Sequence, residues 1–250
     1  MHPLLPAALL LLAGCAHEAL AGPRLLDYPC KSGEQGRHRI EMRATVPDGG
    51  VVKAISRIET RVTSAGAEEF TVEAVQIVQA DGLRDGRSQA SFSVSRKGRL
   101  SRLRSPQLDH PVHGACVRDL AFLFMTLPAG PVEPGSSWAT LRTVYLPELD
   151  LPITLPPIEL AITCKLAAFE GPPDRPIARI DLTAKPAPGM PEGGNVTGVY
   201  RLDVNRGRVL SGSLRGMVPV RILLMELEVP FEVDVFEDQE PPVPPGAGAR

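Results

Sequence analysis

The sequence predicts an all-β protein, either an antiparallel barrel or a strongly curved sheet, built from two similar repeats of about five strands with a short helix between them. Apolar and polar residues alternate along many short segments, which is typical of strands with one buried face. The chain has 23 Gly, 26 Pro and only 4% aromatic residues, so turns are frequent. Matching features also recur in the same order about a hundred residues apart, which indicates a duplication.

The first repeat is expected at residues 37–108. Strands are predicted at 37–46, 55–62, 69–78, 88–94 and 99–103, and each follows the last through a short connection. In the first of them Ile40, Met42 and Ala44 alternate with charged residues. The dipeptide Lys97-Gly98 predicts the turn that joins the last two strands. Short connections favour an antiparallel meander over alternating strands and helices.

The second repeat is expected at residues 136–237, with strands at 138–146, 158–169, 176–184, 195–204 and 208–211. Its Arg206-Gly207 turn stands where the first repeat has Lys97-Gly98. Each copy would have sheet edges to protect and one apolar face to bury. We therefore expect the two copies to close, or nearly close, into one barrel or deeply curved sheet.

The connector between the repeats spans residues 109–135. Its segment 117–125 is apolar on almost every side after Asp119. We expect a short, largely buried helix here that plugs one end of the barrel, with a central strand as the alternative. Residues 146–157 combine four prolines with alternating leucine and isoleucine, which predicts an apolar loop that folds over the barrel mouth or touches lipid.

The N-terminus resembles the signal of bacterial lipoprotein precursors. Leu12-Ala13-Gly14-Cys15 matches their lipobox and follows an apolar run too short to span a bilayer. The resemblance implies that residues 1–14 are removed and that Cys15 carries acyl chains, which would anchor the protein to a membrane. The segment before the apolar run has His2 but no Lys or Arg, and an ordinary secretory signal cut after residue 21 is the alternative.

Location follows from the same resemblance. In many Gram-negative lipoproteins an Asp directly after the cysteine retains the protein at the inner membrane, and here Ala16 follows instead. The resemblance therefore implies an envelope protein anchored by lipid to the outer membrane. Residues 15–36 would form a tether to the first repeat, and residues 238–250 a disordered, Pro-rich tail.

The connector carries a second resemblance. Leu127-Pro128-Ala129-Gly130-Pro131-Val132-Glu133-Pro134-Gly135-Ser136-Ser137-Trp138 is similar to a segment before the second copy in uncharacterised bacterial lipoproteins with two β repeats. The likeness would cover about residues 37–236 and implies the duplicated β fold, but no activity. A looser fold-level likeness is to curved-sheet periplasmic carriers of lipids and lipoproteins.

Three cysteines remain if Cys15 is lipidated. In an oxidising compartment Cys30, Cys116 and Cys164 predict one disulfide and one leftover thiol. Cys30–Cys116 would fix the N-terminal segment, whereas Cys116–Cys164 would join the middle of the chain to its second half. Both pairings stay open.

The sequence offers few groups for chemistry. His110, His113 and Cys116 are the candidate metal ligands, with Asp109 beside them, but no second ligand pair accompanies them and we predict no metal site and no cofactor. No Gly-x-Ser-x-Gly elbow is present, and we predict no enzymatic activity. A net charge of −2 argues against a nucleic-acid partner.

Function is therefore expected in the interior or at the surface of the sheet. Inward residues are small or aliphatic, so the barrel is either packed solid or encloses an apolar cavity. A cavity would bind a lipophilic ligand. The alternative is a structural or protein-interaction module of the envelope, which would need an exposed apolar patch and no ligand.

Overall fold

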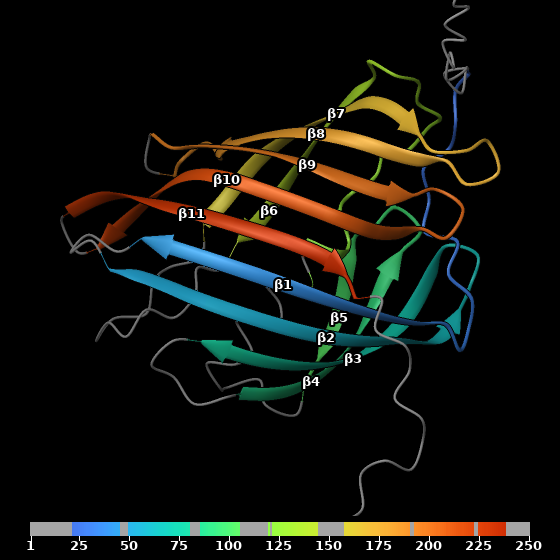
Figure 1. Ribbon diagram of the computed structural model, residues 1–250, viewed down its shortest axis with the longest axis horizontal. Helices are drawn as coiled ribbons and strands as arrows, with labels where there is room; N and C mark the ends of the chain where they lie inside the picture. The colour runs from blue at the N-terminus through green and yellow to red at the C-terminus, as the bar shows by residue number, and fades with distance from the viewer. Residues whose placement is uncertain are drawn as a thin grey trace, which may run out of the picture.

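A computed structural model describes residues 22–45, 50–80, 86–105, 120, 122–144, 158–190, 193–222 and 225–238. Over these residues the chain forms eleven strands in one antiparallel sheet (Figure 1). The strands are β1 (Gln35–Thr45), β2 (Val51–Ala65), β3 (Glu69–Ala80), β4 (Gly86–Ser95), β5 (Leu100–Arg104), β6 (Ser137–Val144), β7 (Ile158–Glu170), β8 (Ile177–Pro186), β9 (Asn195–Asp203), β10 (Arg208–Ile222) and β11 (Met225–Glu237).

The sheet curls strongly but does not close. Its order is β5-β4-β3-β2-β1-β11-β10-β9-β8-β7-β6, so consecutive strands are neighbours and the last strand pairs with the first. The two edges are β5 and β6, and Figure 1 shows both behind the layer formed by β1, β10 and β11. The predicted all-β class and the antiparallel, strongly curved sheet are confirmed. The two repeats of about five strands are not shown by this topology, which has eleven strands.

Strand β11 is not among the strands predicted from the sequence. Val229, Phe231, Val233 and Val235 alternate with acidic residues along it and are all buried. Pro230 weakens the strand pattern, because proline cannot donate to a ladder. The pairing of β1 with β11 ends at Ala44 and Phe231, so Pro230 lies just past the end of that pairing.

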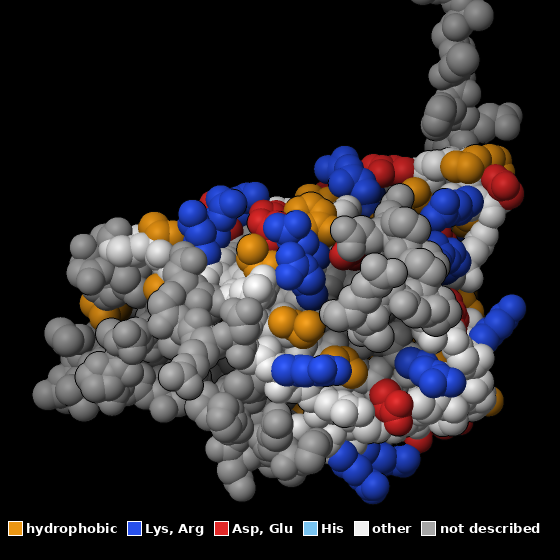
Figure 2. All heavy atoms as spheres, turned by 60° about the horizontal axis from the view of Figure 1, so that its bottom comes forward, with side chains coloured by type: hydrophobic (Ala, Val, Ile, Leu, Met, Phe, Trp, Pro, Cys, Tyr) orange, Lys and Arg blue, Asp and Glu red, His pale blue; other side chains and the backbone are white. Residues whose placement is uncertain are grey.

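The core lies on the concave face. Ile40, Met42 and Ala44 of β1 face it, as the alternation predicted. On the other face Arg39, Glu41 and Arg43 remain partly or fully exposed. Figure 2 shows one side of the molecule, where Lys and Arg side chains are spread among small hydrophobic patches. Burial of one face of each strand supplies the main stabilisation of such a sheet.

An extended N-terminal segment, residues 24–30, crosses one end of the concave face. Leu26 and Tyr28 are fully buried there. Tyr28 lies between the β4–β5 and β9–β10 turns, because a Cβ on Gly98 would come within 2.8 Å of its ring and a Cβ on Gly207 within 2.7 Å of its Cα. Both glycines have positive φ, 79° and 57°, so glycine is favoured at both positions. A side chain of the β4–β5 turn also holds this segment in place: the Lys97 ammonium donates a hydrogen bond to the Leu26 carbonyl (2.7 Å).

A second segment without strand structure, residues 122–127, lies on the concave face and is called the inner segment below. Five of its six residues are buried: Phe122, Leu123, Phe124, Met125 and Leu127. The Phe124 ring contacts the rings of Tyr28, Phe70 and Phe92, with centroids 5.7–6.2 Å apart. The burial expected for this apolar run is thus observed.

The predicted short helix at 117–125 is not shown, because residues 117–119 and 121 lie outside the described part of the chain. The Phe124 amide donates to the Leu120 carbonyl (3.2 Å), a spacing that fits one helical turn. The predicted signal (1–14), the apolar loop (146–157) and the tail beyond residue 238 also lie outside the described residues. Among the residues that are described, no helix is long and apolar enough to cross a bilayer.

Candidate functional site in the concave interior

Two small cavities lie on opposite sides of the inner segment. The first is lined by side chains of β1, β2 and β3 together with Leu123 and Phe124. The second is lined by side chains of β6 to β11 together with Phe122, Met125 and Thr126. Each has a volume of about 40 Å³. That is room for one to a few water molecules, so little open space remains between the inner segment and the sheet.

Three consecutive carbonyls of the inner segment are held by side chains from elsewhere. Arg142 Nη2 donates to Phe124 (2.6 Å), the Tyr28 hydroxyl to Met125 (3.1 Å) and Trp138 Nε1 to Thr126 (2.9 Å). A buried carbonyl without a donor is costly, and these bonds satisfy the segment where no ladder does. The inner segment is therefore fastened mainly through its carbonyls and its apolar side chains.

The second cavity has an apolar wall with one charged group in it. Leu160, Ile162, Leu182, Val196 and Phe231 supply much of the wall. Among them the edge strand β6 points Arg142 inward, opposite Leu160 in the β6–β7 pairing. Burial lowers the pKa of the Arg142 guanidinium, and Tyr200, Tyr28 and Cys164 act in the opposite direction. The interior thus carries a positive charge whose hydration is reduced.

Tyr200 adds a hydroxyl to the same cavity. It stands directly opposite Gly212 in the β9–β10 pairing, and a Cβ on Gly212 would come within 2.8–3.0 Å of the ring. The glycine therefore makes room for the ring to lie flat across β10. Burial raises the pKa of the Tyr200 phenol well above its usual value, with the nearby Arg142 acting in the opposite direction. The hydroxyl stays protonated and can donate a hydrogen bond at any ordinary pH.

Each cavity also has one cysteine in its lining. Cys30 borders the first and Cys164 the second, and both are buried free thiols. Burial raises the pKa of each thiol to about 11. Thiols of this kind are poor nucleophiles at neutral pH, since the thiolate is the reactive form. Cys116 lies outside the described residues, so both predicted pairings with it stay predictions.

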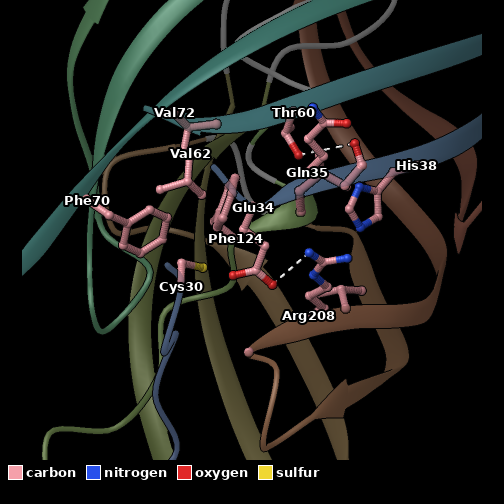
Figure 3. A pocket seen from close by; sticks show the side chains of 14 residues that line it. Cys30, Glu34, Gln35, His38, Thr60, Val62, Phe70, Val72, Phe124 and Arg208 are labelled. Carbon is pink, nitrogen blue, oxygen red and sulfur yellow. Dashed lines mark hydrogen bonds and ion pairs between the residues drawn. The ribbon is translucent and has the colours of Figure 1, made fainter. Parts of the chain in front are cut away.

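The first cavity is the more polar of the two (Figure 3). The Arg208 guanidinium contacts Glu34 at 2.6 Å and Glu237 at 3.5 Å. His38 lies nearby, is 8% exposed, and has an Nδ1 atom without a hydrogen-bond partner among the described residues. Figure 3 shows Phe70, Val62 and Phe124 on the other side of this space. The charged groups pair with one another here, so the first cavity has a structural explanation.

A wider hollow of about 510 Å³ lies on the outer face, over β2, β1 and β11. It is lined by Arg39, Glu41, Arg57, Phe236 and two acidic residues, Glu237 and Asp238. Arg39 and Glu41 form an ion pair at 2.7 Å. The mixed charges of this hollow favour no particular class of ligand. The lining of the second cavity, in contrast, is mostly apolar and favours an apolar ligand.

The structure tests few of the residues that sequence analysis singled out. Cys15, His110, His113 and Cys116 all lie outside the described residues. Within the described ranges no group of three or more His, Cys, Asp or Glu side chains could hold a metal ion. Neither result bears on lipidation of Cys15, which stays a prediction.

The residues that do line the second cavity were not predicted as a site. Arg142 belongs to the segment 138–146 that was expected as a strand, but alternation there gives no clear inner face. Leu141, the apolar neighbour, is 60% exposed, whereas Arg142 points inward. A lone arginine among threonines and a tryptophan was the only signal, and periodicity cannot interpret it.

Comparison with protein-family models and with curated proteins gives no match to this chain. The fold and the interior site are therefore interpreted from their own geometry.

Proposed function

We propose that this is a membrane-anchored envelope lipoprotein that binds a lipophilic ligand on the concave face of its sheet. The observation that carries the proposal is the apolar wall of the second cavity, which is covered by a segment outside the sheet. Cavities that take small lipophilic molecules have volumes of about 300–1,000 Å³. Since each cavity here has about 40 Å³, the ligand would take the place of the inner segment and join the two cavities into one groove.

The way the inner segment is attached supports this exchange. Among the described residues, the backbone amides of the inner segment make one hydrogen bond to a turn of the sheet, from Leu127 to the Lys97 carbonyl at 2.9 Å. Its side chains are Phe, Leu and Met, the same kind of surface as an acyl chain. An acyl chain could therefore replace their apolar contacts with the wall, whereas the three hydrogen bonds to the carbonyls of Phe124, Met125 and Thr126 would have to be broken.

Lipid carried by the purified protein tests the proposal. The chain with Cys15→Ser is purified from bacteria and its bound lipids are extracted and quantified by mass spectrometry. We expect roughly one lipophilic molecule per chain. Ala184→Phe, which fills the second cavity from β8, should lose it, because Ala184 is 3% exposed and lines that cavity. Thr183→Phe is the matched control, since Thr183 is exposed on the other face of the same strand.

Anchoring is tested separately. The proposal requires that protein from bacterial membranes begins at Cys15 and carries acyl chains, and that Cys15→Ser blocks both changes. Intact-mass measurement reads both, and separation of inner from outer membranes tests the expected outer-membrane location. An unmodified N-terminus created after residue 21 would replace the lipoprotein part of the proposal with a secreted protein.

The interaction-module alternative has less support. The large apolar side chains that are exposed in the described structure lie on six different strands or segments: Leu25, Val51, Ile77, Leu141, Met217 and Phe236. Side chains exposed singly in this way are common on protein surfaces and do not indicate an interface.

We also infer that the two halves are copies of one unit with a short helix in the connector. The positions of the register shifts support the duplication. The β2–β3 and β7–β8 pairings each contain one register shift, and the β4–β5 and β9–β10 pairings each contain one as well. The last two hairpins also turn at positive-φ glycines, Gly98 and Gly207. In such a scheme β11 is the additional strand that joins the second copy to β1.

A further inference from the structure

The N-terminal segment fixes the point at which the chain that follows Cys15 enters the folded sheet. Arg24 exchanges two backbone hydrogen bonds with Val132, both 2.8 Å long. The Arg24 guanidinium also lies over the Phe169 ring, 5.5 Å from its centroid. Two residues later, Leu26 is fully buried. These contacts hold the entry point at the end of the sheet that carries the β7–β8 and β9–β10 turns (Figure 1).

Cys15 cannot lie far from this entry point. The stretch of about nine residues between Cys15 and Arg24 spans at most about 30 Å when it is fully extended. Strand β2, with 15 residues, is about 50 Å long. If Cys15 carries acyl chains, the entry end of the sheet is therefore held close to the bilayer. The sheet then either stands on this end or lies on its side.

The surface around the entry point is apolar. The pairing of Arg24 with Val132 places Leu25, which is 50% exposed, beside the loop 129–135. The Gly135 amide donates to the Leu166 carbonyl (2.7 Å), which fastens the same loop to β7, the strand that leads into the β7–β8 turn. Exposed apolar residues of these three segments form what is called the entry rim below: Pro23, Leu25, Ala129, Pro131, Pro172 and Pro173.

We propose that the entry rim rests on the bilayer to which Cys15 is anchored, so that the sheet stands on this end. The inference rests on the proposed lipid anchor and adds the protein surface that the anchor brings to the lipid. Leu25 alone would not indicate an interface, since single exposed apolar side chains are common. The tether, however, keeps the rim at a high local concentration beside the headgroups, so a weak apolar contact is sufficient.

The charges at the two candidate contact surfaces favour the standing orientation. Around the rim, Glu133, Asp174 and Arg175 are exposed, and because both signs occur we expect no strong preference for an anionic surface. The outer face of the sheet carries ion pairs along its strands, such as Arg215 with Glu232 at 2.6 Å. A sheet lying on its side would press such charges against lipid, whereas the rim presents apolar side chains.

This orientation also places the proposed ligand site relative to the membrane. Leu160, Ala184 and Val196 line the second cavity and lie near the ends of β7, β8 and β9 that are opposite to the entry rim. The ligand would therefore be bound in the half of the sheet that points away from the anchored bilayer.

Depth measurements on the anchored protein test the inference. The full chain, acylated at Cys15, is reconstituted in phosphatidylcholine vesicles that contain nitroxide-labelled lipid. An environment-sensitive fluorophore is attached through Pro173→Cys on the rim or through Val51→Cys at the opposite end, where Val51 is 52% exposed. We expect the rim label to lose fluorescence to the nitroxide and to shift its emission to shorter wavelength, and the label at position 51 to do neither. The parent without an added cysteine gives the background from its own thiols.

Charge substitutions test the rim itself. Leu25→Asp should lower the ratio of docked to undocked molecules about tenfold, since lost apolar contact and an added charge both act against lipid. Val51→Asp is the matched control, with nearly the same exposure, and should leave quenching of the rim label unchanged. Ala129→Asp is a second rim variant that disturbs little packing, because Ala129 is exposed. Circular dichroism shows that each variant is folded.

The outcomes separate this inference from the lipid anchor. If neither label is quenched while the protein stays on the vesicles, the anchor stands and the rim contact is refuted. A rim that docks on another protein gives the same result, because these vesicles hold no other protein. If the label at position 51 is quenched and the rim label is not, the orientation is wrong. If the protein has no acyl chain at Cys15 and stays in solution, the proposed anchor fails and this inference fails with it.

Discussion

His38 should make the stability of the protein depend on pH. The ring lies on the inner face of β1 and is 8% exposed. Burial lowers its pKa from 6.5 to about 4, the positive Arg208 acts in the same direction, and a hydrogen bond with the Val209 backbone and the more distant Asp238 act against it. The Glu34 and Glu237 carboxylates nearby are in contact with Arg208. The folded protein therefore holds His38 neutral under conditions where the unfolded chain protonates it.

The size and sign follow from the two pKa values. Between about pH 6.5 and pH 4 the unfolded state binds one proton more than the folded state, so stability falls as the pH falls. A difference of about 2.5 pKa units, at about 1.4 kcal/mol per unit, gives a loss of about 3 kcal/mol from this one residue. Well above pH 6.5 the ring is neutral in both states and the residue contributes no further pH dependence.

Urea denaturation from pH 8 to pH 4 measures the effect. We compare the parent with His38→Gln, which removes the titrating group and keeps a hydrogen-bond donor of similar size. The difference in unfolding free energy between the two should change by about 3 kcal/mol in favour of the variant between pH 6.5 and pH 4. If the two proteins lose stability in parallel over that range, His38 is not held neutral and the reasoning is wrong. Titration of the His38 ring by NMR gives the folded-state pKa directly.

Three further outcomes can be checked by similar means. Phe124→Ala should lower the unfolding free energy by about 3–5 kcal/mol in urea titrations, because three aromatic contacts and a buried side chain are removed. Gly98→Ala should lower the melting temperature more than Gly135→Ala does. Both glycines have positive φ, so both substitutions strain the backbone. A Cβ on Gly98 would also collide with the Met125 carbonyl, whereas a Cβ on Gly135 would meet nothing within 4 Å. Equal losses would argue against the close packing of that turn. In the reduced protein, Cys30 and Cys164 should resist iodoacetamide at pH 8 in the folded state and react in urea, with mass spectrometry as the readout, since burial raises both pKa values to about 11.

Alternation was sufficient to predict the antiparallel class and most strands, because one face of each strand is buried and the other is charged. It failed at β11, where Pro230 interrupts the pattern; the proline lies just past the last residue pair of β1 with β11. The inner segment was recognised as buried from its composition alone. The sequence could not show that this segment separates two cavities, or which three side chains hold its carbonyls. Both features depend on contacts between residues far apart in sequence. Arg142 could not be assigned to the interior, since both faces of β6 mix polar and apolar residues.

The pairing of β1 with β11 has a consequence for how the chain is completed. The first strand has β2 on one side, and its other side is filled by the last strand, which is made some 180 residues later. Until Val233 and Val235 are available, β1 presents an open edge and the buried face of the sheet lacks its centre. Folding therefore cannot finish strand by strand as the chain emerges, and a chain cut before β11 would keep an exposed, adhesive edge. A protein with this topology depends on its last strand to complete folding, and until then proteolysis and aggregation compete with it.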